Sequence, residues 1–226
     1  MKYIVIGLGY FGTSLATKLT SLGNEVIGVD NRNDRAEELK DRITKVVIMD
    51  STKTNALQSL PVSDVDAVIV AIGEDIGSSI LTLSLLKKMD VKRLIGRAIN
   101  PMHQTILGEL GIAEIIHPEE DTASEVSSML MLRNAKSIMM VNDSFAIVEI
   151  SLPAKYIGHT LDTINMEERF GIKPVAVKIA PKDKGLLKLM NLDYQIDKEC
   201  DRQRPLREKD MLLLLGEIEK IKRFID

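Results

Sequence analysis

The first half of the chain alternates short apolar runs with longer amphipathic segments. Each apolar run has the length of a buried strand, and each amphipathic segment has the length of a helix that connects two strands. The expected strands cover residues 3–7, 25–30, 45–49, 67–72, 93–96 and 114–116. The expected helices cover residues 11–22, 34–42, a short stretch from 52, 76–89 and 102–110. This alternation predicts an α/β fold with a Rossmann-like, doubly wound parallel sheet.

A further helix is expected to begin at Pro118 and to run to about Asn134. Proline suits the first turn of a helix, and the acidic run Glu119–Asp121 favours the positive end of the helix dipole. This helix leads from the alternating half of the chain into a region with a different pattern.

After Lys136 the chain changes to short strands that alternate between apolar and polar residues. Strands are expected over residues 145–152, 173–179 and 211–215, and an amphipathic helix over 217–225. Turn residues separate them at Pro153–Ala154, Pro181–Gly185 and Arg207–Asp210. The sequence therefore predicts a Rossmann-like domain over residues 1–135 and a small α+β domain over residues 136–226.

The charge balance of the chain argues against a nucleic-acid partner. Its 226 residues include 30 basic and 33 acidic ones, for a formal net charge of −3, and no polybasic block. The longest apolar runs are far shorter than the roughly 20 residues that cross a bilayer, and no secretory leader is visible. The single cysteine, Cys200, indicates a reducing compartment. We expect a soluble cytoplasmic protein.

The most specific motif lies at the N-terminus, where a short apolar strand runs into Gly7, Gly9 and Gly12 and a second strand ends at Asp30. This is the dinucleotide-binding fingerprint in its strand–helix–strand context. Gly7 permits a tight turn, Gly9 lets backbone N–H groups approach a phosphate, and Gly12 lets the helix press against the sheet. Asp30 can accept hydrogen bonds from ribose and would repel a 2′-phosphate, so NAD-like or adenine nucleotides are favoured over NADP.

Ligands of open α/β sheets bind beyond the carboxyl ends of the strands, which adds candidates by position. Asp50 and Ser51 suit recognition of adenine or ribose, and they suit capping of the next helix equally well. Gly73 suits either a close backbone approach to a ligand or an ordinary turn. Arg97 can neutralise phosphate or pair with a nearby carboxylate.

Other side chains give weaker signals. The three histidines, His103, His117 and His159, do not follow a zinc-ligand spacing. Four methionines gather near the domain junction and suit either the core or an interface: Met129, Met131, Met139 and Met140.

With these motifs the chain resembles the RCK regulators of potassium transport, the cytoplasmic subunits of Trk-type and Ktr-type uptake systems. In the first domain the resemblance rests on Val5–Gly12, Val29–Asp30, Met49–Thr52, Val70–Gly73, Gly96–Ala98 and Ile116–Glu119. In the second it rests on Gly158–Asp162, Phe170–Ile172 and Pro205–Asp210. The resemblance covers essentially the whole chain, and its order of two modules is more specific than the glycine motif alone.

The resemblance implies a ligand-controlled regulatory subunit and not an enzyme. In this family paired N-terminal domains assemble into a ring, typically an octamer, beneath a membrane-embedded potassium pore, and nucleotides bias the shape of the ring. The protein would then be attached peripherally to the inner face of the cell membrane. The helix from Glu119, which joins the two modules, is expected to act as a lever or a swapped arm.

The resemblance also implies a set of nucleotide-binding residues. They are Gly7, Gly9, Tyr10, Phe11, Gly12, Asp30, Asn31, Arg32, Asp50, Ser51, Ala71, Ile72, Gly73, Arg97 and Glu119. Within this set the glycines would cradle phosphates, Asp30 would hold ribose, and Asp50 and Ser51 would lie at the adenosine end. Arg97 would sit near phosphate. Glu119 matches a position that can approach a divalent cation or the terminal phosphate. Some Ktr regulators also bind cyclic di-AMP in the second module, for which this sequence assigns no residues.

One position departs from the family pattern. Many Ktr regulators carry Arg between the second glycine and the Phe of the loop, where it reaches a neighbour's γ-phosphate, whereas this chain has Tyr10. Tyrosine lacks the cation that would favour a triphosphate over a diphosphate. We therefore expect no discrimination of ATP over ADP, and NAD(H), ADP and AMP are equal candidates.

Two alternative functions stay open at the level of sequence. An NAD-dependent oxidoreductase would use the same glycine motif, but it needs a general acid or base, and the second domain has one histidine, His159. A nucleotide sensor that acts on another membrane transporter would carry the same motifs, because the pore is a different polypeptide.

Overall fold

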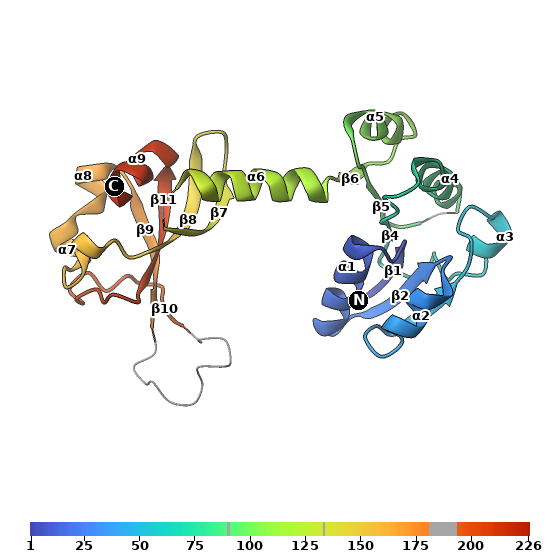
Figure 1. Ribbon diagram of the computed structural model, residues 1–226, viewed down its shortest axis with the longest axis horizontal. Helices are drawn as coiled ribbons and strands as arrows, with labels where there is room; N and C mark the ends of the chain where they lie inside the picture. Colours follow the sequence, from blue (N-terminus) through green and yellow to red (C-terminus); the bar gives the residue numbers. More distant parts are fainter. Residues whose placement is uncertain (90, 133, 181–193) are drawn as a thin grey trace. The chain divides into compact units, whose positions relative to one another are not determined.

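Figure 1 shows the computed structural model, which describes residues 1–89, 91–132, 134–180 and 194–226. These residues divide into two compact units, Met1–Glu120 and Asp121–Asp226. Helix α6 (Pro118–Met131) begins in the first unit and continues into the second. The boundary expected after residue 135 lies beyond the end of this helix, whereas the compact units divide within its first turn.

The described residues of the first unit form a parallel sheet of six strands. These are β1 (Lys2–Ile6), β2 (Glu25–Asp30), β3 (Lys45–Ile48), β4 (Ala67–Val70), β5 (Leu94–Arg97) and β6 (Glu114–Ile116). They lie in the order β3-β2-β1-β4-β5-β6, and every neighbouring pair is parallel. The order reverses direction between β1 and β4, which is the topological switch point of a Rossmann-like sheet. The predicted fold class is confirmed.

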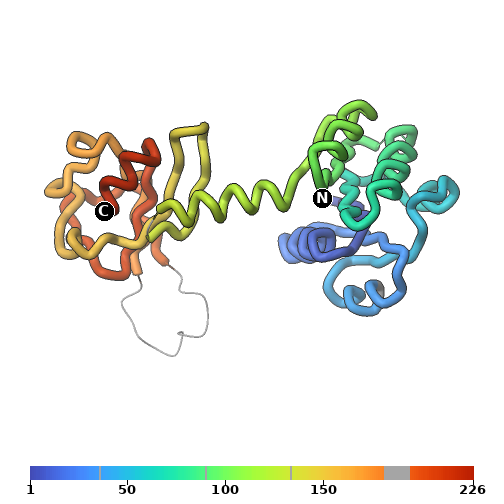
Figure 2. The backbone as a smooth tube through the Cα atoms, turned by 45° about the horizontal axis from the view of Figure 1, so that its top comes forward, coloured from blue at the N-terminus to red at the C-terminus, as the bar shows by residue number. Residues whose placement is uncertain are grey.

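Helices cover both faces of this sheet (Figure 2). They are α1 (Tyr10–Ser21), α2 (Asn33–Leu39), α3 (Thr54–Leu57), α4 (Ile76–Lys87) and α5 (Pro101–Glu109). Val5 packs in a cluster with residues of α1 and α2, whereas Ile4 and Ile6 pack in a second cluster with residues of α3, α4 and α5. Successive side chains of a strand point to opposite faces, so these two clusters are the two sides of one sheet.

The second unit is built on an antiparallel sheet. Its described strands are β7 (Ala135–Met140), β8 (Phe145–Ser151), β9 (Lys173–Ile179), β10 (Gln195–Asp197) and β11 (Met211–Glu217). Their order is β10-β9-β11-β8-β7. The helical segments are the 3₁₀ turn η1 (Ala154–Tyr156), α7 (Leu161–Ile164), α8 (Met166–Phe170) and α9 (Ile218–Ile225). This antiparallel module confirms the predicted α+β character.

Several boundaries and elements differ from the prediction. Helix α6 ends at Met131 and not near Asn134, because Asn134 has a left-handed backbone with φ of 66°. Strand β4 ends at Val70, so Ala71 and Ile72 lie in the loop that follows it. Strands β7 and β10 were not predicted, since they lie at the edges of the sheet and most of their side chains are exposed. The turn expected at Pro181–Gly185 lies outside the described residues.

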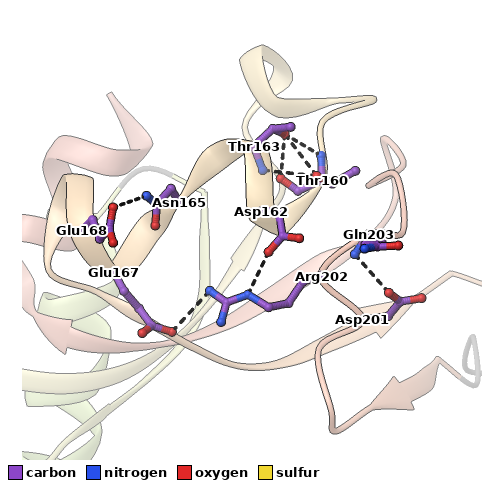
Figure 3. A network of polar contacts seen from close by, with 9 residues as sticks. All are labelled: Thr160, Asp162, Thr163, Asn165, Glu167, Glu168, Asp201, Arg202 and Gln203. Carbon is purple, nitrogen blue, oxygen red and sulfur yellow. Dashed lines mark hydrogen bonds and ion pairs between the residues drawn. The ribbon is translucent and has the colours of Figure 1, made fainter.

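Polar contacts tie the loops of the second unit together (Figure 3). Arg202 reaches Asp162 of α7 at 3.1 Å and Glu167 of α8 at 3.7 Å, and all three side chains are about half exposed. Asp210, before β11, is fully buried and pairs with Arg204 at 2.8 Å. Asp210 therefore anchors the start of β11 from inside, whereas the Arg202 contacts join α7 and α8 to the segment before β11 at the surface.

In the described ranges, none of the helices is both long enough and apolar enough to cross a lipid bilayer.

Candidate functional site

The predicted site residues follow the carboxyl ends of the parallel strands. The glycine loop (Gly7–Gly12) follows β1, Asp30 ends β2, Asp50 and Ser51 follow β3, and Ala71–Gly73 follow β4. Arg97 ends β5, and Glu119 follows β6 in the first turn of α6. Because all six strands are parallel, these ends meet at one edge of the sheet, and β1 and β4 flank the switch point where ligands bind.

Two glycines of the loop are required by close packing. Gly7 has φ of 92°, and a Cβ there would lie 2.9 Å from the backbone nitrogen of Ile72. A Cβ on Gly12 would overlap the carbonyl oxygen of Gly7. These two positions admit only glycine, since α1 presses directly against the turn that follows β1.

Gly9 differs from Gly7 and Gly12, because the fold does not require a glycine at this position. Its φ of −66° suits any residue, and a Cβ there would meet no atom within 4 Å. Gly9 is the N-cap of α1, and no side chain within the described residues caps this helix end. The first N–H groups of a helix have no intrahelical acceptor, and the positive end of the dipole lies there. The open space in front of Gly9 therefore suits an anionic group such as phosphate.

Asp30 links the second strand to the glycine loop. Its carboxylate is buried and accepts a hydrogen bond from the N–H of Leu8 at 2.7 Å on Oδ2. The Oδ1 atom accepts from the N–H of Arg32 at 3.0 Å, and the Arg32 Nε lies 3.4 Å from it. A carboxylate has about four acceptor positions, so Asp30 can hold the loop and still accept a hydroxyl group.

The capping interpretation of Asp50 and Ser51 is wrong. Helix α3 begins at Thr54, and its N-cap is Lys53. Asp50 instead accepts hydrogen bonds from the side-chain hydroxyl of Thr52 at 2.6 Å and from its N–H at 2.9 Å. These bonds lower the pKa of Asp50, the side-chain bond more strongly. The buried Ser51 hydroxyl lies 2.9 Å from that of Thr82 on α4, which fixes the loop against the neighbouring helix.

Arg97 brings several predicted residues together at the switch point. Its Nη1 donates to the carbonyl oxygen of Ala71 at 3.2 Å, and its Nη2 pairs with Oε1 of Glu119. The guanidinium carbon lies 5.4 Å from the ring centre of Phe11. A Cβ on Gly73 would lie 2.6 Å from Nη1, so glycine makes room for the guanidinium. Arg97 therefore pairs with a carboxylate, and its role near phosphate stays a prediction.

Two predicted residues are not part of these contacts. The Tyr10 side chain is 93% exposed, and Asn31 is exposed as well. Neither side chain takes part in a hydrogen bond within the described part of the chain. They border the site without being fixed in it, and the roles of the whole predicted set as nucleotide ligands stay predictions.

The residues around Glu119 do not form a cation site within a single chain. Among the described residues, no three His, Cys, Asp or Glu side chains are grouped closely enough to hold a metal. The Glu119 carboxylate is paired with the Arg97 guanidinium, which would oppose a second cation. The role of Glu119 as a divalent-cation ligand stays a prediction.

Two supporting residues were missed by sequence reasoning. The Thr13 hydroxyl donates to the carbonyl oxygen of Leu8 at 2.9 Å and so braces the glycine loop, and Thr82 holds Ser51. Thr82 could have been suspected, because it is a polar residue among the leucines of α4. Nothing in the local sequence distinguishes Thr13.

The comparison with protein families and curated sequences gives consistent matches. Residues 3–118 match the TrkA-N domain model. The Ktr system potassium uptake protein C of Bacillus subtilis is 31% identical over 223 residues, which are 99% of this chain and 95% of that protein. The Ktr system potassium uptake protein A of the same organism has the same identity and coverage.

Solved structures share the fold. The GsuK RCK domain matches with a TM-score of 0.64 and 17% identity over 99% of this chain, which spans 47% of the GsuK chain. A GsuK channel described as bound to NAD matches with a TM-score of 0.63 and 16% identity over 100% of this chain and 39% of that chain. The NAD(P)-binding domain of an exopolyphosphatase-related protein from Archaeoglobus fulgidus matches 54% of this chain and 91% of its own, with a TM-score of 0.50 and 28% identity.

Proposed function

Because this chain belongs to the TrkA-N family and is related over its length to the Ktr potassium uptake proteins, we propose that it is a nucleotide-binding regulatory subunit of a potassium uptake system. The family resemblance predicted from the motifs is confirmed. The observation that supports the proposal is made at the glycine loop, at the switch point of the sheet. The space in front of Gly9 is open, and no side chain among the described residues caps helix α1 there.

The ligand is NAD(H) or an adenine nucleotide such as ADP, ATP or AMP. The space in front of Gly9 would take a phosphate, and Asp30 would accept a ribose hydroxyl. Asp50 and Ser51 would lie at the adenosine end, beyond β3. The NAD(P)-binding domain from Archaeoglobus fulgidus, which shares the fold, supports a dinucleotide as the ligand of the first unit. For the second unit, cyclic di-AMP is a further candidate ligand.

Self-association is part of the proposal, as a dimer and an octameric ring. Every residue of α6 is described, and none of them is buried. Exposed apolar side chains lie on α6 and on the edge strand β7, and we refer to this set of residues as the apolar surface: Val126, Leu130, Met131, Met139 and Met140. Soluble proteins rarely leave such a surface uncovered, which supports a second copy of the chain as its partner. A pore subunit in the membrane would bind the ring, with this chain on the inner face of the membrane.

The proposed mechanism is thermodynamic linkage and not catalysis. A nucleotide that binds one conformation of the ring more tightly than another shifts the equilibrium toward the first. A nucleotide with equal affinity for both conformations would change nothing. The conformational difference is then transmitted to the pore, and no chemical step on the nucleotide is needed.

The proposal is tested by potassium uptake in cells that express the cognate pore. Uptake is measured without this protein, with the wild-type chain and with Gly9→Ala, together with calorimetry of each nucleotide on the purified chains. We expect uptake to depend on the protein and to lose its regulation in Gly9→Ala. Unchanged uptake in all three strains would favour a sensor for another transporter, and steady NADH turnover with a simple carbonyl substrate would favour an oxidoreductase.

A further inference from the structure

Two buried hydroxyl groups join the loop after β3 to helix α4. The Ser51 hydroxyl lies 2.9 Å from that of Thr82, and each is the only hydrogen-bond partner of the other among the described residues. Ser51 is 8% exposed and Thr82 is fully buried, although the two residues are 31 positions apart in the sequence. A buried hydroxyl that loses its partner is costly, so this bond favours one position of the loop against α4.

Both residues have possible partners closer in the sequence and do not use them. A serine shortly before a helix often caps it, but α3 begins at Thr54 and its N-cap is Lys53. A threonine within a helix often donates to the carbonyl oxygen four residues earlier, whereas the Thr82 hydroxyl meets Ser51 instead. The Ser51 hydroxyl is therefore used inside the protein, and its side chain leaves little surface for a ligand.

The same loop places Asp50 beside the end of β2. The N–H of Met49 donates to the carbonyl oxygen of Asp30 at 2.9 Å. The Oδ1 atom of Asp50 accepts both hydrogen bonds from Thr52, at 2.6 Å and 2.9 Å. The Asp50 side chain is 48% exposed, and its Oδ2 lies 3.8 Å from Nζ of Lys53, beyond hydrogen-bond distance. Oδ2 can therefore still accept a hydroxyl group of a ligand.

We propose that Thr82 is a positioning residue of the nucleotide site, because it holds Ser51 and thereby fixes Asp50 at the nucleoside end. The inference rests on the proposed function, since it assumes that the nucleoside lies beyond β3. Thr82 acts without touching the nucleotide, and Ser51 serves as an anchor and not as a ligand. A loop that is already held in its binding position loses less conformational entropy when the nucleotide binds, which raises the affinity. By linkage, the bound nucleoside also stabilises the contact between the loop and α4.

The test uses purified full-length chains with ADP as the probe. Thr82→Val removes the hydroxyl with little change of shape, whereas Thr82→Ser keeps a hydroxyl. Ser51→Ala, alone and combined with Thr82→Val, completes a double-mutant cycle. The matched control is Ser79→Ala, because Ser79 is fully buried on the same helix and its hydroxyl has no partner among the described residues. Calorimetry measures ADP binding, and hydrogen exchange follows the backbone amides of residues 49–53 and of the glycine loop.

We expect Thr82→Val and Ser51→Ala each to weaken ADP binding about threefold to tenfold, and the double variant to bind ADP no more weakly than either single variant. Thr82→Ser should bind ADP within about twofold of the wild type, and Ser79→Ala should match the wild type. In Thr82→Val the amides of residues 49–53 should exchange faster, while those of the glycine loop keep their rates. ADP should slow the exchange of residues 49–53 in the wild type, and less so in Thr82→Val.

Each outcome separates the positioning role from the proposed function. If ADP binds the wild type and Thr82→Val equally well, the positioning role is overturned while nucleotide binding stands. It is also overturned if the effects of Ser51→Ala and Thr82→Val add in the double variant, because Ser51 then contacts the nucleotide by itself. Faster exchange of the glycine loop and of residues 49–53 alike in Thr82→Val would mean a general loss of stability, and would overturn it as well. If no nucleotide binds the wild type, the proposed function fails, and the positioning role fails with it.

Discussion

Gly9 and Gly12 lie three residues apart, and the structure gives them separate roles. Gly12→Ala should lower the free energy of unfolding by more than about 2 kcal/mol, because its Cβ would overlap the backbone of Gly7. Gly9→Ala should change the free energy of unfolding by less than about 1 kcal/mol, since the added Cβ meets open space. Gly9→Ala should nevertheless weaken nucleotide binding at least about tenfold. Urea unfolding and calorimetry measure the two effects, and equal binding by Gly9→Ala and the wild type would exclude a phosphate in front of this glycine.

Tyr10 allows a test of nucleotide preference. Its side chain is 93% exposed and supplies no cation to a third phosphate. We expect ADP and ATP to bind the wild type with affinities within about threefold of each other, and Tyr10→Ala to keep that ratio. Calorimetry with both nucleotides measures it. A strong preference for ATP that Tyr10→Ala abolishes would contradict this expectation.

The buried His103 leads us to expect that the folded protein loses stability in acid. It is fully buried on α5, and neither ring nitrogen has a hydrogen-bond partner among the described residues. Burial lowers the pKa of His103 below its usual value near 6.5, so the unfolded chain binds a proton that the folded chain does not. Protonation of His103 in the unfolded chain therefore lowers the free energy of unfolding as the pH falls below about 6.5 toward the lowered folded-state pKa.

The measurement is urea unfolding of the wild type and of His103→Leu between about pH 5 and pH 7. His103→Leu should be less sensitive to acid than the wild type, because leucine does not bind a proton. An unchanged acid sensitivity in His103→Leu would show that other groups cause it.

Strand β11 depends on a buried ion pair at its start. The Asp210 carboxylate accepts hydrogen bonds from Arg204 at 2.8 Å, from the N–H of Arg207 at 2.9 Å and from the N–H of Ala180 at 3.2 Å. Asp210→Asn should destabilise the second unit by about 2–4 kcal/mol, because it leaves the Arg204 charge without its partner. The half-exposed Asp162 is the control, and Asp162→Asn should cost less than about 1 kcal/mol. Hydrogen exchange of the backbone amides of β8 and β11 measures the loss of stability in both variants. Equal protection of these amides in Asp210→Asn and Asp162→Asn would refute a special role for Asp210.

The parts of the structure that sequence predicts well are those with local causes. The glycine loop, the parallel strands and Asp30 follow from periodicity and from spacing within about thirty residues. The predictions that were wrong or missing concern residues whose contacts lie far away in the sequence, and strands at the edge of a sheet. Ser51 is held by Thr82, which is 31 residues away, and α3 begins later than the capping interpretation requires. Strand β7 was missed because an edge strand with exposed apolar side chains lacks the alternation of a half-buried one.

At the scale of the whole molecule, the apolar surface predicts self-association. Leu130 is 83% exposed, so Leu130→Glu should leave the stability of the single chain within about 0.5 kcal/mol of the wild type. If Leu130 is covered by a second copy, a charge there should weaken the assembly at least about a hundredfold, because a buried, unpaired carboxylate is costly. Analytical ultracentrifugation of the purified chain measures the change in mass.

Leu22 supplies the control for this prediction, because it is 65% exposed at the C-cap of α1 and lies outside the apolar surface. Leu22→Glu should therefore assemble as the wild type does. If Leu130→Glu and the wild type have the same mass in solution, the apolar surface is not the contact between copies, and its partner must be sought in the pore. If Leu130→Glu dissociates and also loses regulation of potassium uptake, assembly through α6 is a condition of function.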